Sequence, residues 1–369
     1  MMQTIDTEQP LWVKSRRGDY PVWVMSHAYQ NATLFKPLLE NRHILVVSHQ
    51  SISDHYFPVL EATARSLSAS KIALHIIPEG DQHKTISQAE ALWTHCLENQ
   101  YRRDALMIAL GGGVVGDLTG FAASCYLRGI DFIQCPTSLL AQIDAAIGGK
   151  TAVNHVLGKN LIGAFYSPQA VIIDPTALLT LPKREFNAGL AEMIKYGLIL
   201  DANFFNWIEK NASQLYEDMT LCKQAIYRSC QLKALVVSED EFESRHRMIL
   251  NFGHTIAHAI ESLLDFKSIL HGEAVAIGMV IATHLACELN ALSYTVLDRL
   301  VALLEVIGLP THVPNTLSIE AIIDKISLDK KYNQTMHWVL LSQLGCAEIS
   351  SNVDIESVKT ILGRWKEPM

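Results

Sequence analysis

Three histidines and one glutamate have types and spacings suited to metal chemistry. His254 and His258 lie four residues apart at a predicted helix start, so both imidazoles face the same side. His271 begins the next predicted helix, and Glu192 places a carboxylate in an otherwise apolar helical segment. Two imidazoles and one carboxylate with an open position form a common catalytic-metal set. Spacing alone favours His254 and His258 as the ligand pair; with 15 histidines in the chain, surface or capping histidines are the alternative explanation.

A glycine-rich turn follows a predicted strand and opens a helix. Gly111, Gly113 and Gly116 have the GxGxxG spacing, which lets a backbone approach a pyrophosphate at a helix N-terminus. A plain strand-to-helix turn explains the same residues. The acid that binds ribose is expected roughly 20 residues later, at a strand end, whereas Asp131 at that distance begins a strand. The turn therefore predicts a nucleotide site of a non-standard kind.

Several cations stand beside small or glycine-rich segments. Each one alone is explained by a solvated surface, but a convergent group would bind phosphate and carboxylate. The candidates are Arg128, Lys150, Lys159, Lys195, Lys233, Arg247 and the pair Lys330 and Lys331.

The elements that would position these residues change character along the chain. The first half alternates helical patterns such as Thr85–Asn99 with short apolar runs, which is typical of a buried parallel sheet. The predicted strands are His43–Val47, Ile72–Ile77, Ala105–Leu110, Phe132–Cys135 and Ala170–Ile173.

The second half is predominantly helical until a strand at Trp338–Leu341. We therefore predict a Rossmann-like α/β domain with a parallel sheet over 1–180 and a mostly α-helical domain over 181–369, with the active site in a cleft between them. The predicted helices are Arg184–Leu200, Leu221–Asp240, Thr255–Leu264, Glu273–Leu289 and Val296–Val306.

The composition restricts the partners. The formal charge of −8 over 369 residues gives no reason to expect nucleic acid or an anionic membrane. Seven scattered cysteines without a CxxC motif suggest buried thiols in a reducing compartment. The N-terminus lacks a secretory pattern, and the longest apolar stretch, between Glu273 and Glu288, is judged too short to span a bilayer. We expect a cytoplasmic enzyme.

Taken in order, six motifs resemble the 3-dehydroquinate synthase family over nearly the whole chain. Related sugar phosphate cyclases share the scaffold, but the forms at Ile143–Ala146 and Leu250–Phe252 favour the dehydroquinate branch. The motifs are GGGVVGDLTG at Gly111–Gly120, SLLAQIDAAIGGKTAVN at Ser138–Asn154, GKNLIGAF at Gly158–Phe165, AEMIKYG at Ala191–Gly197, LNFGHTIAHAIE at Leu250–Glu261 and HGEAVAIGM at His271–Met279.

The resemblance implies a metal set that differs from the one favoured by spacing. Glu192, His254 and His271 would bind a divalent metal, expected to be zinc with cobalt as the alternative. His258 becomes a substrate-side residue in a proton relay. The substrate would be surrounded by Arg128, Asp144, Lys150, Asn160, Lys195, Lys233, Arg247, Asn251, His258 and either Lys330 or Lys331, of which Lys331 is preferred.

The resemblance also implies an NAD site. It would be lined by Glu79, Gly80, Asp81, Gln82, His83, Lys84, Gly113, Val114, Val115, Gly116, Asp117, Thr137, Ser138, Lys150, Lys159, Ala177, Leu178, Leu179 and Thr180. Three departures from the family pattern stand near these sites. Glu79-Gly80-Asp81 replaces the usual Asp-Gly-Glu, Thr137-Ser138 replaces Thr-Thr, and Arg245 stands where glycine is common.

The implied reaction is a lyase step of the shikimate pathway, which leads to aromatic amino acids. 3-Deoxy-D-arabino-heptulosonate 7-phosphate would become 3-dehydroquinate and phosphate by transient NAD-dependent oxidation, β-elimination, reduction and aldol cyclisation. We expect a homodimer with a small-molecule substrate. A metal-dependent polyol dehydrogenase of the glycerol type is the main alternative, since it shares the glycine turn and the metal set but does not need so many cations. A non-catalytic protein on the same fold is a second one.

Overall fold

The computed structural model describes residues 9–69, 71–265, 268–289, 292–333 and 337–367, and for residues 328–333 the backbone only. The chain divides into two compact units. Within the described residues, the N-terminal unit comprises 9–181 and Cys222–Phe242, and the C-terminal unit comprises Pro182–Leu221 and 243–367. The domain boundary at residue 180 stays a prediction; the compact units differ from it by grouping Cys222–Phe242 with the N-terminal half.

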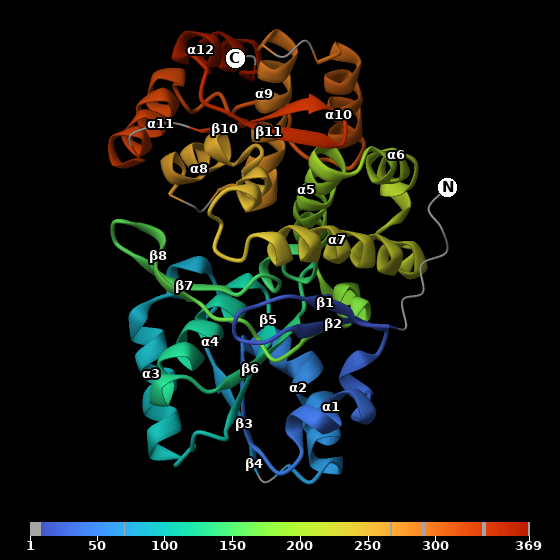
Figure 1. Ribbon diagram of the computed structural model, residues 1–369, viewed down its shortest axis with the longest axis vertical. Helices are drawn as coiled ribbons and strands as arrows, with labels where there is room; N and C mark the ends of the chain where they lie inside the picture. The colour runs from blue at the N-terminus through green and yellow to red at the C-terminus, as the bar shows by residue number, and fades with distance from the viewer. Residues whose placement is uncertain (1–8, 70, 266–267, 290–291, 334–336, 368–369) are drawn as a thin grey trace. The chain divides into compact units, whose positions relative to one another are not determined.

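A seven-stranded sheet forms the centre of the N-terminal unit, in the order β1-β2-β9-β6-β5-β3-β4 (Figure 1). The strands pair in parallel except β1, which runs antiparallel to β2. Parallel strands covered on both faces have near-continuous apolar sequences, as in β5, where every residue is buried. The strands are β1 Leu11–Val13, β2 Tyr20–Val24, β3 His43–Ser48, β4 Lys71–Ile76, β5 Leu106–Gly111, β6 Asp131–Pro136 and β9 Val171–Ile173.

Helices cover both faces of this sheet (Figure 1). Alternate residues of β5 point to opposite faces, so Leu106 and Ile108 enter one core while Met107 and Ala109 enter the other. Residues of α1 and α2 complete the first core, and residues of α3 and α4 complete the second. These helices are α1 Ala32–Leu39, α2 Gln50–Ser66, α3 Ile86–Glu98 and α4 Gly113–Cys125. A further helix, α7 Met219–Glu239, begins in the C-terminal unit and lies mostly in the N-terminal unit.

A second antiparallel pair, β7 (Lys150–His155) and β8 (Gly158–Phe165), forms a hairpin beside α4. The sequence reasoning treated this segment only as cations beside glycines. Gly120 of α4 allows the close approach, since a Cβ atom there would lie 2.4 Å from Thr151 Cγ2.

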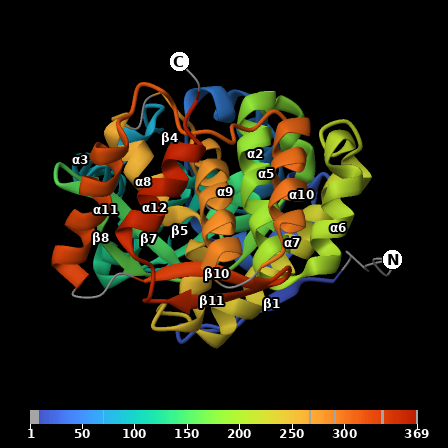
Figure 2. The same cartoon turned by 90° about the horizontal axis from the view of Figure 1, so that it is seen from above.

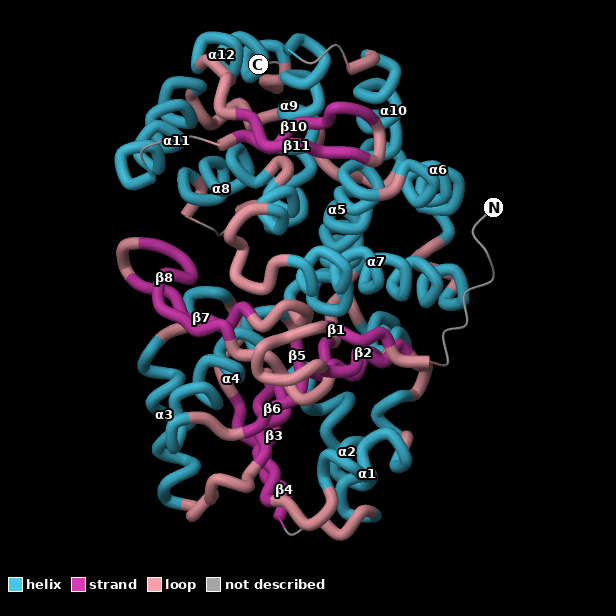
Figure 3. Tube along the Cα trace, in the orientation of Figure 1, coloured by secondary structure: helices cyan, strands magenta, loops and turns pink. Residues whose placement is uncertain are grey.

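The C-terminal unit is helical, with one hairpin of β10 and β11 among the helices (Figure 3). Helix α9 lies at its centre, with α5, α8, α10 and α12 packed around it (Figure 2). The elements are α5 Lys183–Leu200, α6 Ala202–Asn211, α8 His254–Leu263, α9 His271–Leu289, α10 Tyr294–Val306, α11 Ile319–Asn333, α12 Ile355–Arg364, β10 Trp338–Gln343 and β11 Cys346–Ser350.

These elements confirm the predicted fold class, a parallel-dominated α/β half followed by a helical half. Two smaller expectations need correction. Helix α9 spans 19 residues with a mean hydropathy of 1.4, so it is long and apolar enough to cross a membrane. However, 83% of its apolar window is buried inside the protein, as in a core helix. Five cysteines are buried as expected, but Cys125 and Cys346 are exposed.

Candidate functional site

Three helices of the C-terminal unit are brought together by glycine contacts. Gly272, near the start of α9, packs against Ala188 of α5 so closely that a Cβ atom would lie 1.9 Å from the Ala188 carbonyl oxygen. Gly278 of α9 similarly faces Gly253, where a Cβ atom would lie 2.0 Å from the Gly253 carbonyl oxygen. Gly253 has φ +79°, a conformation that glycine adopts without strain, and directly precedes α8. These contacts fix the elements that carry Glu192, His254 and His271.

The side chains of Glu192, His254 and His271 meet within the C-terminal unit. Their ligand atoms all lie within 4.8 Å of one another. Glu192 is fully buried, and its Oε1 atom lies 3.5 Å from His254 Nε2 and 3.6 Å from His271 Nε2. Ligands about 2.0–2.2 Å from a tetrahedral zinc ion are separated by roughly 3.3–3.5 Å. The two distances from Glu192 therefore match those between ligands of a zinc-sized ion, and three protein ligands would leave a fourth position for a substrate.

Both imidazoles are oriented through their other nitrogen. His254 Nδ1 lies 3.1 Å from the carbonyl oxygen of Phe252, which accepts its hydrogen bond. His271 Nδ1 lies 3.2 Å from Glu261 Oε2. Hydrogen bonds of this kind place the proton on Nδ1 and leave Nε2 free to bind a metal ion, a common arrangement around metal-binding histidines.

In the metal-free protein the pKa values of His254 and His271 are shifted in opposite directions. Burial and the neighbouring Lys195 cation lower the pKa of His254 well below its usual value. Burial also lowers the pKa of His271, but hydrogen bonds with Glu192 and Glu261 outweigh it and raise the pKa to about 10. The metal-free His271 ring is therefore protonated on both nitrogens at neutral pH, and an incoming metal ion must displace the proton on Nε2.

His258 lies beside the ligand group but outside it. Its ring centroid is 5.4 Å from that of His254 and 6.3 Å from that of His271, and its side chain is exposed. The structure thus groups Glu192, His254 and His271, the set that the resemblance implied, and not the His254–His258 pair that spacing favoured.

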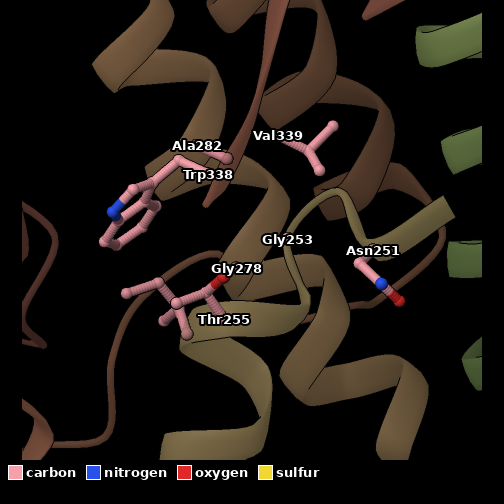
Figure 4. Close-up of a pocket in the computed structure, with 8 residues that line it drawn as sticks. Asn251, Gly253, Thr255, Gly278, Ala282, Trp338 and Val339 are labelled. Carbon is pink, nitrogen blue, oxygen red and sulfur yellow. The ribbon is translucent and has the colours of Figure 1, made fainter. Parts of the chain in front are cut away.

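Three further predicted residues belong to this unit. Lys195, one helical turn after Glu192, is 1% exposed and forms an ion pair with its carboxylate. Arg247 is equally buried, and Asn251 donates a hydrogen bond of 3.2 Å to Glu243. Asn251 also lines a small cavity with Gly253, Gly278, Trp338 and their neighbours (Figure 4). Arg245, the departure from the family pattern, is exposed.

In the N-terminal unit the glycine turn joins β5 to α4 as predicted. A Cβ atom at Gly111 would lie 2.5 Å from Val115 Cγ2, and one at Gly116 would lie 2.7 Å from the Gln134 side chain on β6. Glycines here let the helix pack directly on the sheet, and the first amides of α4 stay near the turn. The partly exposed Gly113 and Val114 keep this N-terminus accessible.

Lys84 connects three predicted residues of the same unit. It is 4% exposed, forms an ion pair with Asp117 of α4, and donates a hydrogen bond of 2.5 Å to Asn160 Oδ1 on β8. Burial raises the pKa of Asp117, and Lys84 acts against that rise. Lys84 therefore holds the hairpin against the glycine turn.

A second link between the hairpin and the loop after β4 runs through Asp81. Lys159 Nζ lies 3.1 Å from Asp81 Oδ2, and Asn154 donates hydrogen bonds of 3.0 Å to both the carbonyl and Oδ2 of Asp81. Asp81, in the Glu79-Gly80-Asp81 sequence that departs from the family pattern, thus connects the loop after β4 to the hairpin. Asn160 has a left-handed backbone conformation with φ +56°, and its backbone N–H donates a hydrogen bond of 3.1 Å to Asn154 Oδ1.

The remaining predicted residues of the N-terminal unit are more dispersed. Lys233 of α7 forms an ion pair with Asp144, which lies in a short helical turn at Ala141–Ala145. Lys150 and Arg128 are exposed. Thr137 is buried after β6, with Ser138 partly exposed beside it, and the turn at Pro175–Thr180 contains Ala177, Leu178, Leu179 and Thr180. The side chains of Lys330 and Lys331 lie outside the described residues.

Sequence reasoning missed Glu261 and the Phe252 carbonyl. The signal for Glu261 is its position seven residues after His254, which places it on the same face of α8. No side-chain pattern identifies the carbonyl. Asn154 was missed as well, because its role depends on the hairpin.

An α/β unit with a glycine turn and a helical unit with a Glu-His-His group define a class of nucleotide- and metal-dependent enzymes. Two solved structures with a similar fold are sugar phosphate cyclases. One is the 2-epi-5-epi-valiolone synthase ValA from Streptomyces hygroscopicus with NAD+ and Zn2+ bound (26% identity, 94% of this chain and 96% of that chain, TM-score 0.87). The other is a 2-deoxy-scyllo-inosose synthase complexed with carbaglucose-6-phosphate, NAD+ and Co2+ (25% identity, 97% and 100%, TM-score 0.86).

Two family models identify a narrower group within this class of enzymes. The N-terminal model of 3-dehydroquinate synthase matches residues 74–188, and the C-terminal model matches residues 189–332. The 3-dehydroquinate synthase of Shewanella loihica is 43% identical over 347 residues, which are 94% of this chain and 96% of that protein. The chain belongs to the 3-dehydroquinate synthase family.

Proposed function

We propose that the chain converts 3-deoxy-D-arabino-heptulosonate 7-phosphate into 3-dehydroquinate and phosphate, with NAD and a divalent metal as cofactors. Membership of the family, shown by a relative that covers 94% of the chain, supports the substrate. The geometry that carries the proposal is the buried Glu192 carboxylate with His254 Nε2 at 3.5 Å and His271 Nε2 at 3.6 Å. Proteins with the same plan bind NAD+ together with Zn2+ or Co2+, and we propose zinc, with cobalt as a substitute.

The residues of the C-terminal unit would hold the metal and act beside it. Glu192, His254 and His271 would bind the ion, which when bound supplies Lewis-acid polarisation of substrate oxygens. Lys195 keeps a cation beside the Glu192 carboxylate in a buried position, where its charge is weakly screened. The exposed His258 would pass protons between the substrate and solvent, since the two ring nitrogens of an imidazole can donate and accept protons.

The residues of the N-terminal unit would hold the nucleotide, which supplies reversible hydride transfer when bound. The first amides of α4 suit a pyrophosphate, and the buried Lys84 fixes Asp117 at that turn. We propose that the cofactor contacts Glu79, Gly80, Asp81, Gln82, His83, Lys84, Gly113, Val114, Val115, Gly116, Asp117, Thr137, Ser138, Lys150, Lys159, Ala177, Leu178, Leu179 and Thr180.

The substrate carries a phosphate and a carboxylate, so it requires several cations. We propose that these anions, and the polar groups between them, are bound by Arg128, Asp144, Lys150, Asn160, Lys195, Lys233, Arg247, Asn251 and Lys331. Two of these already stand in defined pairs, Lys233 with Asp144 and Lys195 with Glu192. A polyol dehydrogenase would leave such a set of cations without a role, and the family match also disfavours it.

The finer expectations remain part of the proposal. A homodimer, a cytoplasmic location and the two-domain division at residue 180 follow from the resemblance and from the composition. Size-exclusion chromatography with light scattering would decide the first of these.

Identification of the product tests the proposed function directly. Purified protein supplied with the heptulosonate phosphate, NAD+ and Zn2+ should yield a carbocyclic product that NMR identifies as 3-dehydroquinate, together with one equivalent of inorganic phosphate. An open-chain ketone as the product would indicate a dehydrogenase and would overturn the proposal.

A further inference from the structure

Glu261, a residue outside the predicted functional set, contacts the proposed metal ligand His271. Its Oε2 atom lies 3.2 Å from Nδ1 of His271, and its side chain is 6% exposed. The opposite nitrogen of the same ring, Nε2, is the one that faces Glu192 Oε1 at 3.6 Å. His271 thus stands between two buried carboxylates, one on each side of the ring.

The two helices that carry this pair are held in fixed positions. Glu261 lies seven residues after His254 on α8, and His271 is the first residue of α9. Gly278 of α9 packs on Gly253, and Gly272 packs on Ala188 of α5. The carboxylate and the ring therefore meet because the backbones that carry them pack closely.

The charge of Glu261 has a direct consequence for His271. A carboxylate accepts only, so Nδ1 must donate its proton to it, and Nε2 then presents its lone pair to a metal ion. The negative charge also makes the imidazole a stronger donor to a metal. A neutral ring with the proton on Nε2 would place a donor toward Glu192 and could not bind the ion.

We propose that Glu261 is a positioning residue that fixes the tautomer and orientation of His271 and thereby raises the affinity of the centre for a divalent metal. The proposal rests on the metal centre of the proposed function. It requires nothing of the substrate or of the redox cofactor. The competing explanation is that Glu261 only ties α8 to α9, in which case its loss would lower stability without changing the metal.

Zinc affinity in the full-length protein separates these two explanations. We would measure the zinc dissociation constant by competition with a chromophoric chelator for wild type, Glu261→Met, Glu261→Gln and the control Glu209→Gln. Methionine fills the volume without an acceptor, whereas glutamine keeps a neutral acceptor. Glu209 forms an ion pair with Arg299 in the same unit, away from the metal ligands. Melting temperatures of the metal-free proteins would report any structural effect.

Glu261→Met should weaken zinc binding about 10- to 100-fold, the usual effect of losing such a partner. Glu261→Gln should recover part of the loss, and Glu209→Gln should match wild type within twofold. Wild-type affinity in Glu261→Met, or equal weakening in both Glu261 variants that follows their melting temperatures, would overturn the proposal.

Two further experimental outcomes also bear on the role of Glu261. If Glu261→Met does not fold, the 15N–1H spectrum of histidine in zinc-loaded wild type and Glu261→Gln decides: wild type should show a His271 Nδ1–H proton that moves in the glutamine variant, and a protonated Nε2 in wild type would overturn the proposal. If wild type binds no zinc, the metal centre of the proposed function fails, and so does the role of Glu261 that depends on it.

Discussion

Gly272 lies against Ala188 so closely that no side chain fits between α9 and α5, since a Cβ atom would stand 1.9 Å from the Ala188 carbonyl oxygen. His271 precedes this glycine, and Glu192 follows Ala188 on α5 by one helical turn. The distance between these two proposed metal ligands therefore depends on a backbone contact outside the proposed ligand set.

Gly272→Ala should separate the two helices and weaken the metal centre. We expect a loss of about 3 kcal/mol in unfolding free energy, the upper end for overpacking, because the obstacle is backbone, together with a clear loss of bound zinc. Gly363→Ala in α12 is the matched control, since its Cβ would lie 3.7 Å from Ile319 Cδ1, an ordinary contact. Equal behaviour of the two variants in denaturant titration and metal analysis would show that the contact is not critical.

Elemental analysis can distinguish the proposed metal ligand His271 from the neighbouring His258. His271→Ala leaves two protein ligands where a catalytic site has three, so the purified variant should lose most of its metal. His258→Ala should keep one metal per chain and lose turnover, since its ring lies outside the ligand group. The reverse result, metal lost with His258 and kept with His271, would restore the ligand pair suggested by spacing.

Lys84→Met should destabilise the N-terminal unit in a pH-dependent way. The change leaves Asp117 without its cation, which costs about 3 kcal/mol, the lower end for breaking a buried pair. Burial already raises the pKa of Asp117, and the loss of Lys84 removes an opposing effect, so the pKa rises further.

Proton linkage predicts that the destabilisation caused by Lys84→Met increases with pH. A carboxyl whose folded pKa is raised binds its proton more tightly in the folded state, so the variant loses stability relative to wild type as the pH rises and regains it as the pH falls through the folded pKa. Denaturant titrations from about pH 4, near the ordinary pKa of a carboxyl, up to about pH 8 would measure this. A destabilisation that is constant across the range would exclude Asp117 as its source.

Lys150→Met tests the proposed role of the cations. Lys150 is exposed at the start of β7, so its removal should leave the melting temperature nearly unchanged. If it binds substrate anions, turnover should fall about 100-fold or more. Lys36→Met, at an exposed lysine of α1, is the control for the loss of one positive charge. Wild-type kinetics in Lys150→Met would remove the residue from the proposed site.

The sequence predicted the regular elements well for identifiable reasons. The strand His43–Val47 and the helix Thr85–Asn99 were found within one residue of β3 and α3, because continuous apolar runs and 3.6-residue periodicity reflect burial directly. The hairpin of β7 and β8 was missed. Residues such as Val156 and Leu161 are exposed there, so its sequence has no regular inward face.

The site was only partly predictable for a different reason. His254 and His258 share a helical face, and that local relationship is visible in the sequence. The group of Glu192, His254 and His271 comes from three helices, and its geometry depends on glycine contacts between them. The resemblance to a family supplied this set where spacing could not. The contacts of Lys84 and Glu261 lie between distant segments and required the structure.

We propose that a transient oxidation drives phosphate loss, and phosphate release under controlled cofactor supply tests this most directly. Protein stripped of nucleotide and metal would be assayed with 3-deoxy-D-arabino-heptulosonate 7-phosphate in three arms: with NAD+ and Zn2+, without NAD+, and with chelator. We predict phosphate release in the complete arm only, with no net NADH absorbance, because the hydride returns to the substrate. Release that persists without NAD+ and metal, or one NADH accumulated for each substrate consumed, would contradict the proposed function.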